Sequence, residues 1–186
     1  MTHKIFKASL LVALAAMLAT GCRKDSDEPI SKVNLFYDTL AYRMPQAFFI
    51  NHGVKDNNDT TFEFDFRLLS ADVVATKDTA IGIGQYLNLE LESRNKLSPA
   101  PGIYKFHRLK GDVGIQNMAF GEFYDSLSFQ TGTFARADTI TAGTVVFATS
   151  GSTVIATIDL TTKLGKKLTG NYTGSVTYFE GDKKKK

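Results

Sequence analysis

The residues that could do chemistry in this chain are few and widely spaced. Among its 186 residues the chain has one cysteine, Cys22, and three histidines, His3, His52 and His107. A metal centre or a nucleophilic triad needs several such side chains together, and none of the spacings typical of zinc, phosphate-binding or nucleophile-elbow motifs occurs. We therefore predict no catalytic residue, no metal site and no cofactor, and we interpret His52 and His107 as surface residues.

Paired carboxylates occur at Glu63/Asp65, Glu90/Glu92 and Glu122/Asp125. Glycoside hydrolysis needs two carboxyl groups in one cleft, one of them with a raised pKa. The first two pairs lie on strand faces that the hydrophobic alternation assigns to solvent. We therefore interpret these carboxylates as surface residues.

The run Asp56–Asp59 (DNND) has the composition of a calcium-binding loop. An EF-hand beginning at Asp56 would need glycine and glutamate where the chain has Thr61 and Arg67. Asparagine and aspartate also favour tight turns. We interpret the run as a hairpin turn.

Cys22 follows a segment with the features of an export signal. Two lysines precede the apolar run Ser9–Thr20, whose roughly 12 residues would span only about 18 Å of a hydrocarbon layer about 30 Å thick. Residues 19–22 (ATGC) resemble the lipobox of bacterial lipoproteins. The resemblance implies that residues 1–21 are cleaved off, that the Cys22 thiol carries diacylglycerol and that the new amine is acylated, for example by palmitate. Two or three acyl chains would anchor the protein stably in a membrane.

The positive charge of the chain is concentrated at its ends. The sequence has 22 Lys and Arg against 19 Asp and Glu; without Lys4, Lys7 and Lys183–Lys186 the balance becomes 16 against 19. A nucleic-acid-binding domain needs a basic face, so we predict no nucleic-acid partner. We expect residues 182–186 to form a solvated lysine-rich tail.

Residues 22–32 have the composition of a disordered linker, because the stretch after Cys22 reads RKDSDEP and offers almost nothing to bury. The stretch also resembles the lipoprotein export signal of the Bacteroidota, in which a lysine and acidic residues after the lipidated cysteine direct the protein to the outer face of the outer membrane. The resemblance implies an outer-membrane, surface-exposed location. The alternative is a plain hydrophilic tether.

Five Asp-Ser/Thr pairs precede a small or aliphatic residue, where average residue usage would give roughly one. These triplets resemble the O-glycosylation sites of exported Bacteroidota proteins. The hydroxyl residues concerned are Thr39, Thr60, Thr79, Ser126 and Thr139. Such pairs also suit turns and strand starts, and that alternative stays open.

Residues 33–181 show the two-residue hydrophobic period of half-buried strands. Alternating rows occur at Phe62–Phe66, Leu87–Leu91, Val154–Leu160 and Leu168–Tyr178. Turn residues separate them at 99–102, 150–151 and 164–167, while 69–79 fits either a short helix or a loop. Roughly ten short strands predict one all-β domain, an antiparallel β-sandwich, with a lipocalin-like open barrel as the alternative.

Residues 111–136 hold many aromatic side chains without clean alternation. We expect part of this segment to be core. An irregular aromatic segment can also present a stacking platform to sugars, and on that reading Phe120, Phe123 and Tyr124 are the candidate ligand-binding residues.

Residues 87–179, with PGIYKF at 101–106 and GKKLTGNYTG at 165–174, are similar in pattern to small uncharacterised surface lipoproteins of the Bacteroidota, for which no activity can be carried over. We expect a non-enzymatic, surface-exposed lipoprotein that binds a glycan or an envelope-protein partner. The alternatives are a structural or assembly accessory of an outer-membrane complex and a hydrolase with a dispersed active site.

Overall fold

The computed structural model describes residues 34–54, 60–76, 79–107 and 116–181. These residues form twelve strands, and no helix among them is long and apolar enough to cross a bilayer. The strands are β1 (Asn34–Tyr37), β2 (Leu40–Tyr42), β3 (Gln46–Val54), β4 (Phe62–Leu69), β5 (Val73–Ala75), β6 (Ala80–Ser93), β7 (Gly102–Phe106), β8 (Asn117–Ser128), β9 (Arg136–Ser150), β10 (Thr153–Thr162), β11 (Lys167–Gly174) and β12 (Thr177–Glu180).

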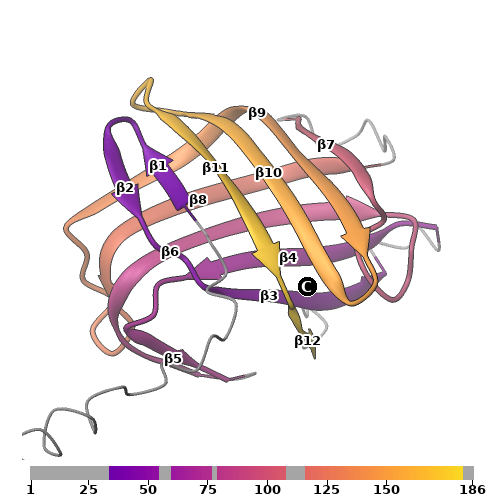
Figure 1. The fold of residues 1–186 in the computed structure, drawn as a ribbon, viewed down its shortest axis with the longest axis horizontal. Coiled ribbons are helices and arrows are strands. Elements are labelled where there is room, and N and C mark those ends of the chain that lie inside the picture. The colour runs from indigo at the N-terminus through magenta and orange to yellow at the C-terminus, as the bar shows by residue number, and fades with distance from the viewer. Residues whose placement is uncertain (1–33, 55–59, 77–78, 108–115, 182–186) are drawn as a thin grey trace, which may run out of the picture. The chain divides into compact units, whose positions relative to one another are not determined.

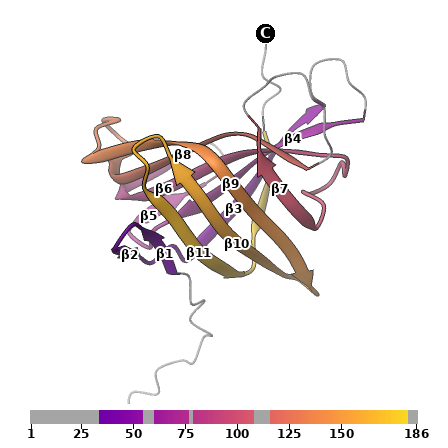
Figure 2. The same cartoon turned by 90° about the horizontal axis from the view of Figure 1, so that it is seen from above.

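The strands form one mixed sheet in the order β12-β3-β4-β6-β8-β7-β9-β10-β11-β1-β2. β5 pairs with β6, and β8 also pairs with β9. The pairs β12–β3 and β7–β8 are parallel and the others are antiparallel. In Figure 1 β9, β10 and β11 cross steeply over β3, β4 and β6, and Figure 2 shows the same two walls from above.

The all-β prediction is confirmed, but the prediction of a two-sheet sandwich is wrong. The sheet is single and curls strongly into a half-barrel. A hydrophobic alternation shows only that each strand buries one of its faces. That face can be the concave face of a curled sheet or the inner face of a sandwich, and the pattern is the same in both. The strands are also more numerous and some are longer than expected: there are twelve among the described residues, and β6 has 14 residues and β9 has 15.

Two short links hold the edges of the sheet near each other. Arg43–Pro45 joins the edge strand β2 to β3, and Ser175–Val176 joins β11 to the opposite edge strand β12. Links of two or three residues span at most about 15 Å, so the sheet has to curl. The expectation of one final strand through Tyr178 is therefore wrong, because the chain crosses to the other edge after Gly174.

The concave face holds the main core. The Phe66 and Phe147 rings meet edge to face, with centroids 5.0 Å apart, and Phe49 and Tyr104 also contact Phe147. Because these rings come from β3, β4, β7 and β9, they join the two walls across the interior. Each buried side chain of this size contributes about 1.5–3 kcal/mol through lost water contact. The predicted inward rows Phe62–Phe66, Leu87–Leu91 and Val154–Leu160 all face this core.

The long strand β6 has two partners on one of its sides. β4 pairs with its second half, from Tyr86 to Ser93, and β5 pairs with its first residues, Ala80 to Gly82. The segment 69–79, expected to be a helix or a loop, thus contains a strand. Gly82 has φ +120°, and a Cβ there would lie 2.4 Å from the Asp72 carbonyl oxygen, so only glycine fits where β5 approaches. We refer to β5 and the adjoining first residues of β6 as the β5–β6 arm.

Candidate functional site

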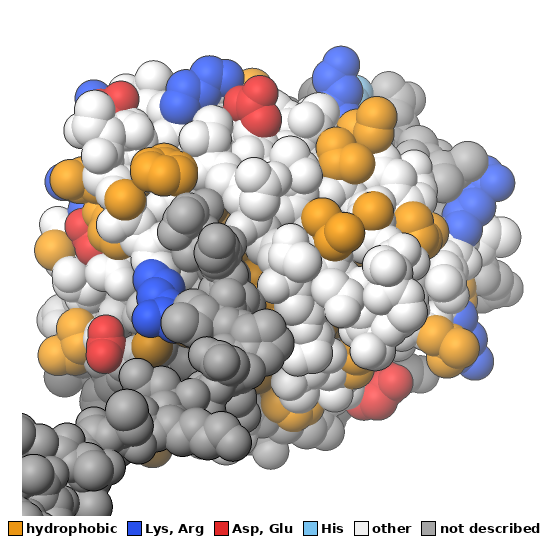
Figure 3. All heavy atoms as spheres, viewed as in Figure 1, with side chains coloured by type: hydrophobic (Ala, Val, Ile, Leu, Met, Phe, Trp, Pro, Cys, Tyr) orange, Lys and Arg blue, Asp and Glu red, His pale blue; other side chains and the backbone are white. Residues whose placement is uncertain are grey.

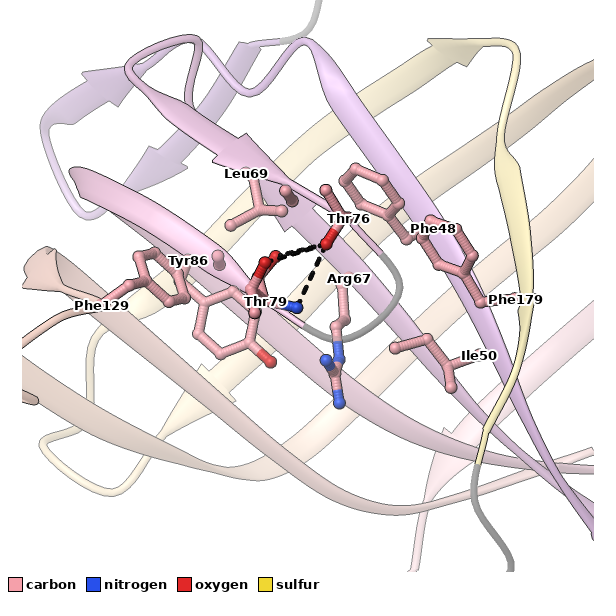
Figure 4. Close-up of a pocket in the computed structure, with 11 residues that line it drawn as sticks. Phe48, Ile50, Arg67, Leu69, Thr76, Thr79, Tyr86, Phe129 and Phe179 are labelled. Carbon is pink, nitrogen blue, oxygen red and sulfur yellow. Dashed lines mark hydrogen bonds between the residues drawn. The ribbon is translucent and has the colours of Figure 1, made fainter.

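A pocket of about 210 Å³ lies on the outer face of β3, β4 and β6. Figure 4 shows its apolar walls, which come from strands far apart in the sequence. On one side the rings of Phe48 and Phe179 stack with centroids 5.7 Å apart. On the other side the ring centroids of Tyr86 and Phe129 are 5.5 Å apart, and the ring planes are inclined at 73°. The edge strand β12 therefore completes the pocket by supplying Phe179.

Three polar side chains line the same pocket. Arg67 comes from β4 between the two aromatic walls, and Thr76 and Thr79 lie between β5 and β6. The two threonine hydroxyls lie 2.9 Å apart, and the Thr76 backbone N–H donates to the Thr79 carbonyl at 2.8 Å. An apolar pocket with a few convergent polar groups is typical of sites that bind small ligands.

Arg67 is held in place by its neighbours on the outer face. Its Nη2 donates to Asp65 Oδ2 at 2.6 Å, and its Nε donates to Asn88 Oδ1 at 3.3 Å. A guanidinium has five N–H donors, and these two bonds leave the other donors available. Arg67 can therefore keep a fixed orientation and still present donors to a ligand.

Asp65 is buried, with 4% of its surface exposed, although alternation placed it in solvent. His52 Nε2 lies 3.1 Å from Asp65 Oδ2, and Glu90 pairs in register with Asp65 on β6. Burial alone would raise the pKa of the Asp65 carboxyl, but His52 and Arg67 outweigh it and hold that pKa below its ordinary value. The carboxylate is therefore charged at neutral pH.

The interpretation of His52, Asp65 and Glu92 as surface residues is wrong. The His52 side chain is only 12% exposed, and Glu92 is as buried as Asp65. A segment distant in sequence covers this part of the outer face, because Gly181, which follows β12, lies beside His52. The hydrophobic alternation within one strand gives no information about burial by segments distant in the sequence.

The structure separates the three aromatic residues proposed for ligand binding. Phe123 faces the core, where it stacks on Tyr37 at 5.3 Å. Phe120 and Tyr124 pair with Glu90 and Tyr86 of β6 on the outer face. Phe123 therefore cannot share a ligand with the other two.

Tyr124 extends the aromatic surface away from the pocket. Its ring lies 6.0 Å from that of Tyr86 and 5.4 Å from that of Phe134, which is half exposed. The Tyr124 hydroxyl donates to Glu122 Oε2 at 2.8 Å, and burial together with this carboxylate raises the Tyr124 pKa. Tyr86 and Phe129 were missed from the sequence because no local spacing links them to Phe179 or Arg67.

The five predicted glycosylation residues lie in different settings. Thr39, Thr60, Thr79 and Ser126 are exposed, whereas Thr139 is half-buried within β9. Asp38, with φ 57°, lies in the turn between β1 and β2, as the turn alternative predicts, whereas Ser126, with φ 55°, lies within β8 beside a register shift of the β6–β8 pairing. Thr79 also lines the pocket.

A second cavity, of about 290 Å³, opens beside β8 and β9. Its residues include Glu122, Asp138 and Lys163. Asp138 accepts from the Tyr37 hydroxyl at 2.8 Å and from the Leu164 N–H at 3.3 Å. These bonds join β1 and the β10–β11 turn to β9, so this aspartate has a structural role.

The described residues contain no group of three or more His, Cys, Asp or Glu side chains that could hold a metal ion. On the face shown in Figure 3 the Lys and Arg side chains lie at separate places rather than in one patch. Cys22, the signal 1–21, the linker 22–32, the DNND run and the tail 182–186 lie outside the described residues.

No protein-family model matches the chain, and no curated protein or solved structure shows significant similarity to it. The resemblance to surface lipoproteins of the Bacteroidota thus remains a prediction from the sequence.

Proposed function

We propose that the chain is a lipid-anchored protein of the outer membrane, exposed at the cell surface, that binds a glycan without catalysing a reaction. The anchor is proposed from the position of Cys22 behind a short apolar signal. The binding role is carried by one observation, the aromatic-walled outer pocket with Arg67 and two threonine hydroxyls at its edge.

The chemistry of this pocket suits a sugar. Aromatic faces supply apolar area against the C–H faces of a sugar ring, and Tyr86, Phe129 and Phe179 supply such rings here. Hydroxyl and guanidinium groups donate to and accept from ring substituents. The volume is below the roughly 300–1,000 Å³ of sites that enclose a drug-sized molecule, so the pocket would receive one terminal unit of a longer chain.

A glycan microarray probed with the mature chain carrying Cys22→Ala tests the binding role. We expect binding to a subset of glycans that share one terminal unit. Phe129→Ala removes one wall at a half-buried turn position and should abolish this binding. Phe36→Ala is the matched control, because Phe36 is an exposed aromatic residue on β1, outside the pocket, and it should leave binding unchanged.

Protease treatment of intact cells tests the location. A surface-exposed protein should be degraded while a periplasmic marker stays intact, and survival of the protein would contradict the proposed exposure. Binding of no glycan on the array would favour the accessory role, which predicts a stable envelope-protein partner on purification.

A further inference from the structure

The inward-facing row of β6 continues beyond the core. Leu87, Leu89 and Leu91 are buried, whereas beyond the half-buried Gln85 the next residues of the same parity, Ile83 and Ile81, are 61% and 54% exposed. Val74 on β5 pairs in register with Ile81 and is 68% exposed. The alternate residues Val73 and Ala80 pack on the outer cluster at the pocket. We call Val74, Ile81 and Ile83 the apolar row of the arm.

The described chain begins at the same end of the half-barrel as this row. Leu35 pairs in register with Tyr42, whose hydroxyl donates to Asp125 Oδ2 at 3.0 Å. Gln85 Nε2 donates to the other oxygen of that carboxylate at 3.2 Å, and Gln85 is two residues from Ile83. This chain of contacts links the start of β1 to the arm.

The stretch between Cys22 and Asn34 limits how far the domain can lie from its anchor. Twelve residue steps span at most about 43 Å when fully extended, whatever path they take. The stretch itself is a poor cover for an apolar row, because residues 23–28 read RKDSDE. A second copy is also a poor occupant, since stable protein interfaces use roughly 20–30 residues a side and the row has three.

We propose that the apolar row rests on the surface of the lipid bilayer that holds the anchor. This inference depends on the lipid anchor of the proposed function. Aliphatic side chains gain by entering the boundary between headgroups and acyl chains, and a short tether gives the arm a high effective concentration at that boundary. Three side chains then suffice for a contact that a free domain would not make. The other face of the arm lines the pocket, so the contact would fix how the pocket lies relative to the membrane.

The chain has no tryptophan, so a single introduced tryptophan reports on one position. The lipidated mature protein carrying Ile81→Trp is reconstituted in phosphatidylcholine vesicles, with and without lipids brominated on their acyl chains. Ile103→Trp on β7 is the matched control, because Ile103 is 59% exposed and Figures 1 and 2 place β7 at the opposite end of the domain from β5. Val74→Trp serves if Ile81→Trp does not fold.

We expect the Ile81→Trp emission to shift to the blue and to lose most of its intensity with brominated lipid, while the Ile103→Trp emission does neither. If the protein floats with the vesicles but the arm tryptophan is not quenched, the inference is overturned and the anchor stands. A blue shift that depends on protein concentration and not on lipid would assign the row to a second copy and overturn the inference as well. A protein that does not float with the vesicles would refute the lipid anchor, and the inference with it.

Discussion

Replacing Asp65 by asparagine should destabilise the domain in a way that depends on pH. The buried carboxylate accepts from Arg67 at 2.6 Å and contacts His52 at 3.1 Å. Asparagine keeps the shape but loses the charge, and a hydrogen bond to a charged group contributes about 1.5–3 kcal/mol. We therefore expect Asp65→Asn to lower the free energy of unfolding by about 2 kcal/mol at pH 7, or about 4–8 °C in midpoint for a domain of this size.

The sign of the pH dependence follows from the lowered pKa of Asp65. A carboxyl whose pKa is lower in the folded state stabilises the protein above its ordinary pKa, and that contribution is lost as the pH falls through the folded value. Urea unfolding followed by circular dichroism between pH 7 and pH 2.5 measures it. The difference between wild type and Asp65→Asn should shrink below about pH 4.

Asp159→Asn is the control for this experiment, because Asp159 forms an exposed pair with Lys167 at 3.2 Å. Exposed pairs contribute at most about 1 kcal/mol, so this variant should remain close to wild type at every pH. Equal effects of the two substitutions, or a cost of Asp65→Asn that does not change with pH, would refute the assignment of Asp65 as a buried, charged partner of Arg67.

Three further predictions concern the anchor, a backbone position and the core. Cys22→Ala should remove the mass of the acyl chains and move the protein from the membrane to the soluble fraction on cell fractionation; an unchanged mass would contradict lipidation. Gly143→Ala should cost about 1–3 kcal/mol of stability in urea unfolding, because Gly143 has φ +113° and a Cβ would lie 2.2 Å from the Asp159 carbonyl oxygen. Leu89→Ala, at a fully buried position, should cost about 2–5 kcal/mol, and a cost below 1 kcal/mol would contradict its place in the core.

The sequence predicted which residues of a strand face the core better than it predicted the architecture. Leu87, Leu89 and Leu91 alternate with polar residues because one face of β6 is buried and the other is only partly covered. The half-barrel depends instead on pairings between distant residues, such as Asn34 with Asn171 and Phe179 with Ile50. Nothing in a local hydrophobic period specifies such pairs, so a sandwich and a curled sheet are indistinguishable at that level.

The candidate site was only partly accessible from the sequence for the same reason. The aromatic-rich segment predicts Tyr124 as a binding residue, and Tyr124 does belong to the outer aromatic surface. The same segment predicts Phe123, which instead faces the core, because register shifts in the β6–β8 pairing obscure the alternation there. Arg67 gave no signal, because Phe179 and Phe129, which line the same pocket, lie far from it in the sequence.

A thermal-shift titration of the mature, unlipidated protein with the glycans selected on the array tests the central claim most directly. A ligand at 100 times its dissociation constant adds about 2.7 kcal/mol, or roughly 5–10 °C in midpoint. We predict a rise of that size for wild type and Phe36→Ala, and none for Phe129→Ala. A midpoint that no glycan raises, or a rise that Phe129→Ala retains in full, would contradict glycan binding at the outer pocket.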